Sequence, residues 1–130
     1  LEFRRVLFRS DAKGNNLTGT LTSELSLLTE LRQFVALNGN IGGTLPPKLG
    51  DLTSLTHFIF SNNSISGEIS EDFLADSPME VFMISDNDFR GEIPPSLFKM
   101  SSIYQVFLDN NRFSGSIGDG FGSLPNLVSF

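Results

Sequence analysis

The sequence contains no cysteine and no tryptophan, and its single histidine is His57. Without cysteine the chain can form no disulfide framework, no thiolate zinc site and no cysteine nucleophile. It also lacks any apolar run long enough to span a bilayer. A lone histidine without a triad-like partner is typical of a surface residue rather than a catalytic one. We therefore predict no catalytic residue, no metal site, no cofactor and no enzyme activity in this chain.

Basic residues are scarce. Nine lysines and arginines stand against 15 aspartates and glutamates, and the formal net charge is −6. An acidic surface without a basic patch repels the phosphates of nucleic acids and of anionic membranes. The sequence thus predicts a partner that is not nucleic acid, and we expect membrane attachment only through a segment downstream of this chain.

Residues 1–10, LEFRRVLFRS, differ from the rest of the sequence. The string reads as the translation of a sequencing adaptor, and Ser10 falls where the repeat described below has phenylalanine or valine. We interpret these residues as an artefact that lies outside the native protein. The alternative is a divergent first coil, with Leu7 in its first apolar position.

From residue 11 onward the sequence repeats every 24 residues. The first apolar column of the repeat consists of Leu31, Leu55, Met79, Ile103 and Leu127. A glycine column with the same spacing consists of Gly19, Gly43, Gly67, Gly91 and Gly115. A fixed period of this length indicates a solenoid of stacked coils. The predicted domain, 11–130, divides into a partial coil 11–30, full coils 31–54, 55–78, 79–102 and 103–126, and a truncated coil 127–130.

Each coil contains a short stretch in which apolar residues alternate, which is typical of a half-buried strand. We predict strands at 33–37, 57–61, 81–85 and 105–109, stacked into a parallel sheet. The segment from Thr22 to Leu37 would also suit an amphipathic helix. However, the same columns carry Pro46–Pro47 and Pro94–Pro95, which a helix interior does not accept. The period therefore predicts strands here and no long helix.

Two further columns have a predicted structural role. An asparagine at the end of each strand can turn inward and form hydrogen bonds with main-chain groups that the bend leaves unpaired. Repeated in each coil, these side chains would form a ladder of Asn15, Asn63, Asn87 and Asn111. Gly39 occupies the same column and is the exception. The glycine column predicts a positive φ or a close approach between coils. Asp76 stands where Leu52 and Met100 are apolar, so we expect that coil to be loosened near Asp76–Pro78.

With these columns and the G-x-I-P element at residues 91–94, the chain resembles a plant-type leucine-rich repeat protein over residues 12–130. The resemblance implies an α/β solenoid, a right-handed coil or horseshoe of 24-residue repeats. It places the parallel sheet on the concave face and irregular or 3-10 segments on the convex face. Since neither end carries a polar cap, which solenoids need, we expect an internal fragment of a longer protein.

One surface stands out as a candidate binding site. The outward centres of the predicted strands form an apolar row of Val35, Ile59, Met83 and Phe107. The neighbouring positions that complete the predicted ligand site are His57, Val81, Tyr104, Gln105, Asp86 and Asp109. Apolar rows rimmed by polar groups mark binding sites, although β-branched and aromatic residues also favour strands without any ligand. We predict Phe107 and Met83 as the central anchors.

The resemblance implies a recognition module, part of the ectodomain of a leucine-rich repeat receptor-like kinase or receptor-like protein. Such a module binds a protein or peptide on its concave face, at an extracellular or cell-surface location, and a kinase domain can follow downstream. The alternative is a secreted inhibitor of an enzyme, similar to polygalacturonase-inhibiting proteins. The sequons at Asn16 and Asn62 support secretion only weakly, because a chain with ten asparagines contains one or two sequons by chance.

Overall fold

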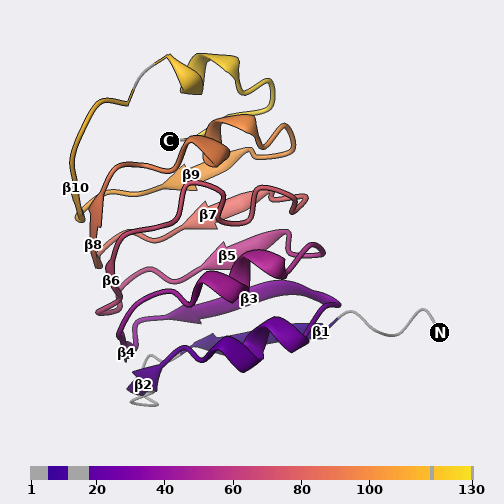
Figure 1. The fold of residues 1–130 in the computed structure, drawn as a ribbon, viewed down its shortest axis with the longest axis vertical. Helices are drawn as coiled ribbons and strands as arrows, with labels where there is room; N and C mark the ends of the chain where they lie inside the picture. The colour runs from indigo at the N-terminus through magenta and orange to yellow at the C-terminus, as the bar shows by residue number, and fades with distance from the viewer. Residues whose placement is uncertain (1–5, 12–17, 118, 130) are drawn as a thin grey trace.

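The computed structural model describes residues 6–11, 18–117 and 119–129. In these residues the chain winds through successive coils that stack on one another (Figure 1). The large parallel sheet has the order β1-β3-β5-β7-β9 and consists of Val6–Asp11, Leu31–Leu37, His57–Ile59, Val81–Met83 and Gln105–Phe107. Every strand of this sheet comes from a different coil.

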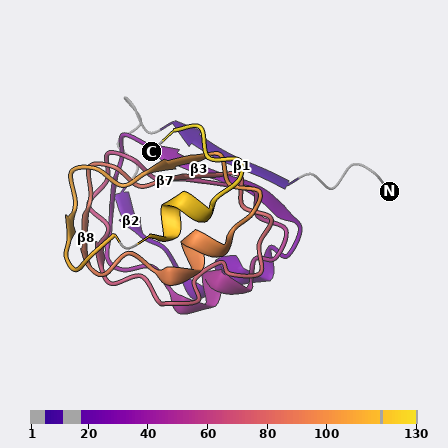
Figure 2. The same cartoon turned by 90° about the horizontal axis from the view of Figure 1, so that it is seen from above.

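Short strands and 3-10 helices make up the rest of each coil. The strands of two small parallel sheets are β2 (Thr18–Thr20), β4 (Asn40–Gly42), β6 (Ser66–Gly67), β8 (Asp88–Gly91) and β10 (Arg112–Phe113). The 3-10 helices are η1 (Ser23–Leu27), η2 (Pro47–Asp51), η3 (Pro95–Lys99) and η4 (Gly120–Ser123). Figure 2, which looks along the stack, shows the large sheet opposite the helices, with β2 and β8 on the flank. The predicted solenoid is confirmed.

The large sheet follows the 24-residue register. Phe34 lies opposite Phe58, Phe58 opposite Phe82, and Phe82 opposite Val106. Strands β5, β7 and β9 end two residues earlier than predicted, whereas β3 begins two residues earlier. Pairing between coils nevertheless continues past the strand ends, since the Phe60 N–H donates to the Met83 carbonyl at 2.8 Å. The chain then bends at Asn62, whose φ is 58°.

Strand β1 pairs with the edge of this sheet in a register that differs from that of the other strands. Leu7 lies opposite Gln33, and Phe8 opposite Phe34, whereas the 24-residue register would put Leu7 opposite Leu31. Edge pairing uses backbone groups, which any sequence supplies. The interpretation of residues 1–10 as an artefact therefore stays a prediction.

Aromatic rings fill the middle of the interior. The Phe58 ring lies 4.6 Å from that of Phe60, 5.6 Å from Phe82, 5.9 Å from Phe73 and 6.1 Å from Phe34, centroid to centroid. All five side chains are buried. Leu25 lies in η1 and packs on the same core. The segment from Thr22 to Leu37 thus holds one turn of 3-10 helix and then β3, and no long helix forms there.

The strand-end asparagines bond to the preceding coil. Their side-chain oxygens accept backbone N–H groups at 3.0–3.2 Å, in the pairs Ile41–Asn63, Ile65–Asn87 and Phe89–Asn111. Their amide nitrogens donate to carbonyls of the preceding coil at 2.8–2.9 Å, in the pairs Asn63–Ala36, Asn87–Phe60 and Asn111–Ile84. Each asparagine thus satisfies groups that the bend removes from regular pairing. Asn15 and the sequon at Asn16 lie outside the described residues.

The convex segment of coil 55–78 departs from the others. Residues 71–76 form turns rather than a 3-10 helix. Asp76 is exposed, and the fully buried Leu74 contributes to the core instead, with a φ of 57° that is costly for a leucine. Ser77 holds this turn, because its N–H and hydroxyl both donate to the Leu74 carbonyl, at 3.0 and 2.8 Å. The coil is therefore rearranged around Leu74.

All five glycines of the column have a positive φ, and all but Gly19 lie close to the preceding coil. Gly91 has a φ of 79°, and a Cβ placed there would lie 2.8 Å from the Glu68 side chain of the preceding coil. We expect Gly91→Ala to lower the free energy of unfolding by about 1–2 kcal/mol, the cost of a left-handed residue, to be measured by chemical denaturation. Gly122→Ala is the matched control, since its Cβ would meet nothing within 4 Å. Equal stability of the two variants would contradict the steric explanation.

Candidate recognition surface

The outer side of the large sheet brings the predicted binding residues together. In the sheet register, Val35 lies opposite Ile59, Ile59 opposite Met83, and Met83 opposite Phe107. A second row runs parallel to this one and consists of Gln33, His57, Val81 and Gln105. We call the surface formed by these two rows and the residues at both ends of the strands the sheet face.

Two predicted site residues are not available to a ligand. Val35 and Val81 expose only 6% and 3% of their surface, although neither belongs to the interior core cluster. Val81 lies between His57 and Gln105 in register, and the longer side chains of these neighbours leave a short valine little exposed area. Ile59, Met83, Phe107, His57, Tyr104 and Gln105 are half-buried. The accessible apolar row is thus Ile59, Met83 and Phe107.

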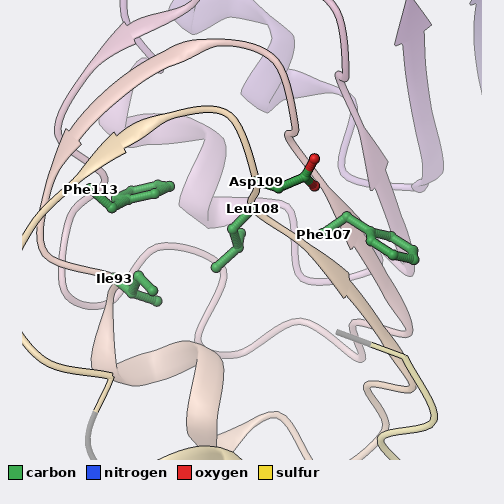
Figure 3. Close-up of a pocket in the computed structure, with 5 residues that line it drawn as sticks. All are labelled: Ile93, Phe107, Leu108, Asp109 and Phe113. Carbon is green, nitrogen blue, oxygen red and sulfur yellow. The ribbon is translucent and has the colours of Figure 1, made fainter.

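The Phe107 end of this row borders a cavity of about 560 Å³, lined by Ile93, Phe107, Leu108, Asp109 and Phe113. Figure 3 shows the Phe107 ring on the opposite side of its strand from Leu108, Ile93 and Phe113. Leu108, Ile93 and Phe113 occupy interior columns of the repeat, so the repeat pattern does not predict them at a surface. Only the structure shows that all three are half-buried here.

A polar rim follows the carboxyl ends of the strands. It consists of Ser61, Ser85 and Asp109, and of Asn38, Asn62, Asp86 and Asn110, which share φ values of 54–58°. Asparagine and aspartate tolerate this left-handed conformation better than other side chains. The Asn62 amide donates to Asn38 at 3.1 Å. Of these residues, only Asp86 and Asp109 were predicted as part of the site, and the bonds between rim residues were not predicted, although their 24-residue spacing was a usable signal.

The two predicted acidic residues are joined within this rim. The Asn110 amide donates to Asp86 Oδ1 at 2.8 Å and approaches Asp109 Oδ2 at 3.4 Å. The Ser85 hydroxyl donates to Asp109 Oδ1. The Asp86 N–H also donates to the Asp109 carbonyl at 3.0 Å. Both carboxylates are exposed and held in place.

His57 lies at the opposite edge of the sheet face. The Thr56 hydroxyl donates to the Arg32 carbonyl at 2.9 Å, and His57 Nδ1 lies 2.9 Å from the same hydroxyl oxygen. Because the hydroxyl proton is already used, the oxygen accepts from His57 Nδ1–H. In the neutral ring, Nε2 is then an acceptor that a ligand can use.

Comparison with known proteins agrees with the repeat. The Leucine Rich Repeat family profile matches residues 54–75, and no curated protein sequence matches the chain. Several solved structures are similar. The crystal structure of a TDR receptor is 30% identical, with a TM-score of 0.82 over 87% of this chain. The leucine-rich repeat ectodomain of the receptor kinase SOBIR1 from Arabidopsis thaliana is 25% identical, with a TM-score of 0.85 over 96%.

A third similar structure is the plant peptide hormone receptor RGFR1 in complex with RGF2. It is 34% identical, with a TM-score of 0.80 over 88% of this chain. The chain spans 20%, 66% and 18% of the lengths of the TDR receptor, SOBIR1 and RGFR1 chains respectively. The similarity therefore concerns a shared stretch of repeats.

Proposed function

We propose that this plant-type leucine-rich repeat chain is a recognition module of a receptor ectodomain, which binds a protein or peptide on its sheet face. The proposal rests chiefly on the half-buried apolar row of Ile59, Met83 and Phe107, which runs across three strands and is bordered by a polar rim. Accessible apolar rows of this kind mark interaction sites.

The similar solved structures also support a receptor function. RGFR1 is a plant peptide hormone receptor whose structure was solved in complex with RGF2, and SOBIR1 is a receptor kinase. These similarities favour a receptor over an inhibitor of an enzyme. The proposal includes an extracellular or cell-surface location, a polypeptide ligand rather than nucleic acid, and no catalytic role for the chain itself. Within the described residues, no helix has the length and apolar character needed to cross a bilayer.

The proposal predicts that Phe107 dominates binding. Peptides selected from a random display library on the wild-type chain should bind Phe107→Ser more weakly by about 2 kcal/mol or more, the threshold for a binding hot spot. The side chain lies on the outer side of the strand (Figure 3), so the unfolding midpoint should stay the same. Isothermal calorimetry measures the affinity, and circular dichroism the unfolding.

The matched control is Leu27→Ser. Leu27 is an apolar residue with 77% exposure on η1, on the other side of the solenoid, so its replacement should change neither quantity. Unchanged affinity in Phe107→Ser would remove the sheet face from the proposal. A lower unfolding midpoint in Phe107→Ser would instead mean that the ring contributes to the core.

A further inference from the structure

We infer that the segment bound on the sheet face is a basic polypeptide, which places an apolar side chain against Met83 and Phe107 and a lysine or arginine on Asp86 and Asp109. This inference rests on the proposed function and adds the chemistry of the ligand. Its basis is the charge of the accessible part of the sheet face, together with the position of the carboxylates beside the apolar row.

The charges on the sheet face are unbalanced. Glu80, Asp86 and Asp109 lie in coils 79–102 and 103–126, whereas the exposed Arg32 lies two to three coils away in coil 31–54. Within the described residues the one ion pair joins Arg112 to Asp88 on the flank, at 3.0 Å. The carboxylates of the sheet face therefore have no cationic partner in the described part of the chain.

Asp86 and Asp109 are held in position for a ligand. Their backbones are joined by the hydrogen bond from the Asp86 N–H, and Asn110 and Ser85 bond their side chains. An ionised carboxylate has about four acceptor positions, and these bonds use one or two on each. The remaining lone pairs are exposed on adjacent coils, where a guanidinium or ammonium group can reach both.

The acidic pair adjoins the apolar row. Asp109 follows Phe107 by two residues, about 7 Å along an extended chain. Neighbouring side chains of one ligand, one apolar and one basic, can therefore occupy the ring and the carboxylate together. An acidic ligand would meet like charges at the same place, and such juxtaposition disfavours binding.

Three synthetic peptides of equal length test the inference. Each alternates leucine with a second residue, which is lysine in the first, serine in the second and glutamate in the third. We expect the lysine peptide to bind most tightly and the glutamate peptide most weakly, by calorimetry at low salt. Raising the salt concentration should reduce the difference, because exposed charges are screened.

Matched variants locate the effect. In Asp86→Asn/Asp109→Asn the side-chain oxygens that accept from Asn110 and Ser85 remain, so the fold should be unchanged. This variant should bind the lysine peptide about three- to tenfold more weakly, as expected for the loss of two exposed ion pairs, and the serine peptide as the wild type does. The control Asp51→Asn/Asp72→Asn changes the net charge equally in the convex segments, and should bind the lysine peptide within about twofold of the wild type.

The outcomes separate this inference from the proposed function. Equal binding of the three peptides, all weakened by Phe107→Ser, would overturn the inference and support recognition on the sheet face. Lysine-peptide binding that Phe107→Ser leaves unchanged, or that both double variants weaken equally, would overturn the inference as a non-specific charge effect. Failure of all three peptides to bind would count against both.

Discussion

Replacing Phe58 with alanine should lower the free energy of unfolding by about 3–5 kcal/mol, the usual cost of removing a buried phenylalanine. The ring is fully buried and packs against four other aromatic rings from three coils. It is stacked on Phe60 and Phe82, with interplanar angles of 24° and 19°, and meets Phe34 and Phe73 edge-on. The variant would therefore lose hydrophobic burial, ring contacts and the packing between neighbouring coils.

Chemical denaturation followed by circular dichroism measures this loss. Leu27→Ala is the control, because it also shortens an apolar side chain but at a position with 77% exposure, where a change below about 0.5 kcal/mol is expected. If Phe58→Ala unfolded at the same denaturant concentration as the wild type, the interior assignment of the phenylalanine column would be wrong. Phe82→Ala should behave similarly, since Phe82 is buried and stacks on Phe58.

Replacing Asn87 with alanine should also be costly, by about 2–3 kcal/mol. Its Oδ1 accepts from the Ile65 N–H at 3.0 Å, and its amide donates to the Phe60 carbonyl at 2.9 Å and the Ile84 carbonyl at 3.1 Å. The side chain is 8% exposed, so water cannot readily replace it. Each buried group left without a partner costs about 1–3 kcal/mol.

Asn126→Ala is the control for this prediction. Asn126 is exposed, and its amide donates to the Ser101 carbonyl of the preceding coil at 2.8 Å. Water can replace that bond, so the loss should stay below about 1 kcal/mol. Equal losses in the two variants, measured by denaturation, would mean that burial does not set the strength of the asparagine ladder.

Much of the fold could be predicted from the sequence, because a repeat imposes the same environment on the same column. Phe34, Phe58 and Phe82 share a column, so stacking the coils brings them side by side in the interior. Gly91 shows the same logic for the backbone, since its column combines a positive φ with contact to the preceding coil. The period also outweighed local helix propensity between Thr22 and Leu37.

Positions that break the pattern could not be predicted in the same way. Asp76 indicated an irregular coil, but the sequence did not show that Leu74 would enter the core in a left-handed conformation. Whether Leu74 can fill the interior in place of residue 76 depends on the shape of the space between the neighbouring coils. The period specifies which residues share a column and says nothing of how an exceptional coil repacks.

The candidate site, too, could be predicted only in part from the sequence. The repeat alone is enough to place Val35, Ile59, Met83 and Phe107 in one outer row, because side chains alternate along a strand and strands stack in register. Which of the four a ligand can reach follows from the folded structure, because exposure depends on the lengths of neighbouring side chains. The hydrogen bonds from Asn110 to Asp86 and Asp109 could not be predicted either. They form between neighbouring coils and depend on the left-handed bend after each strand.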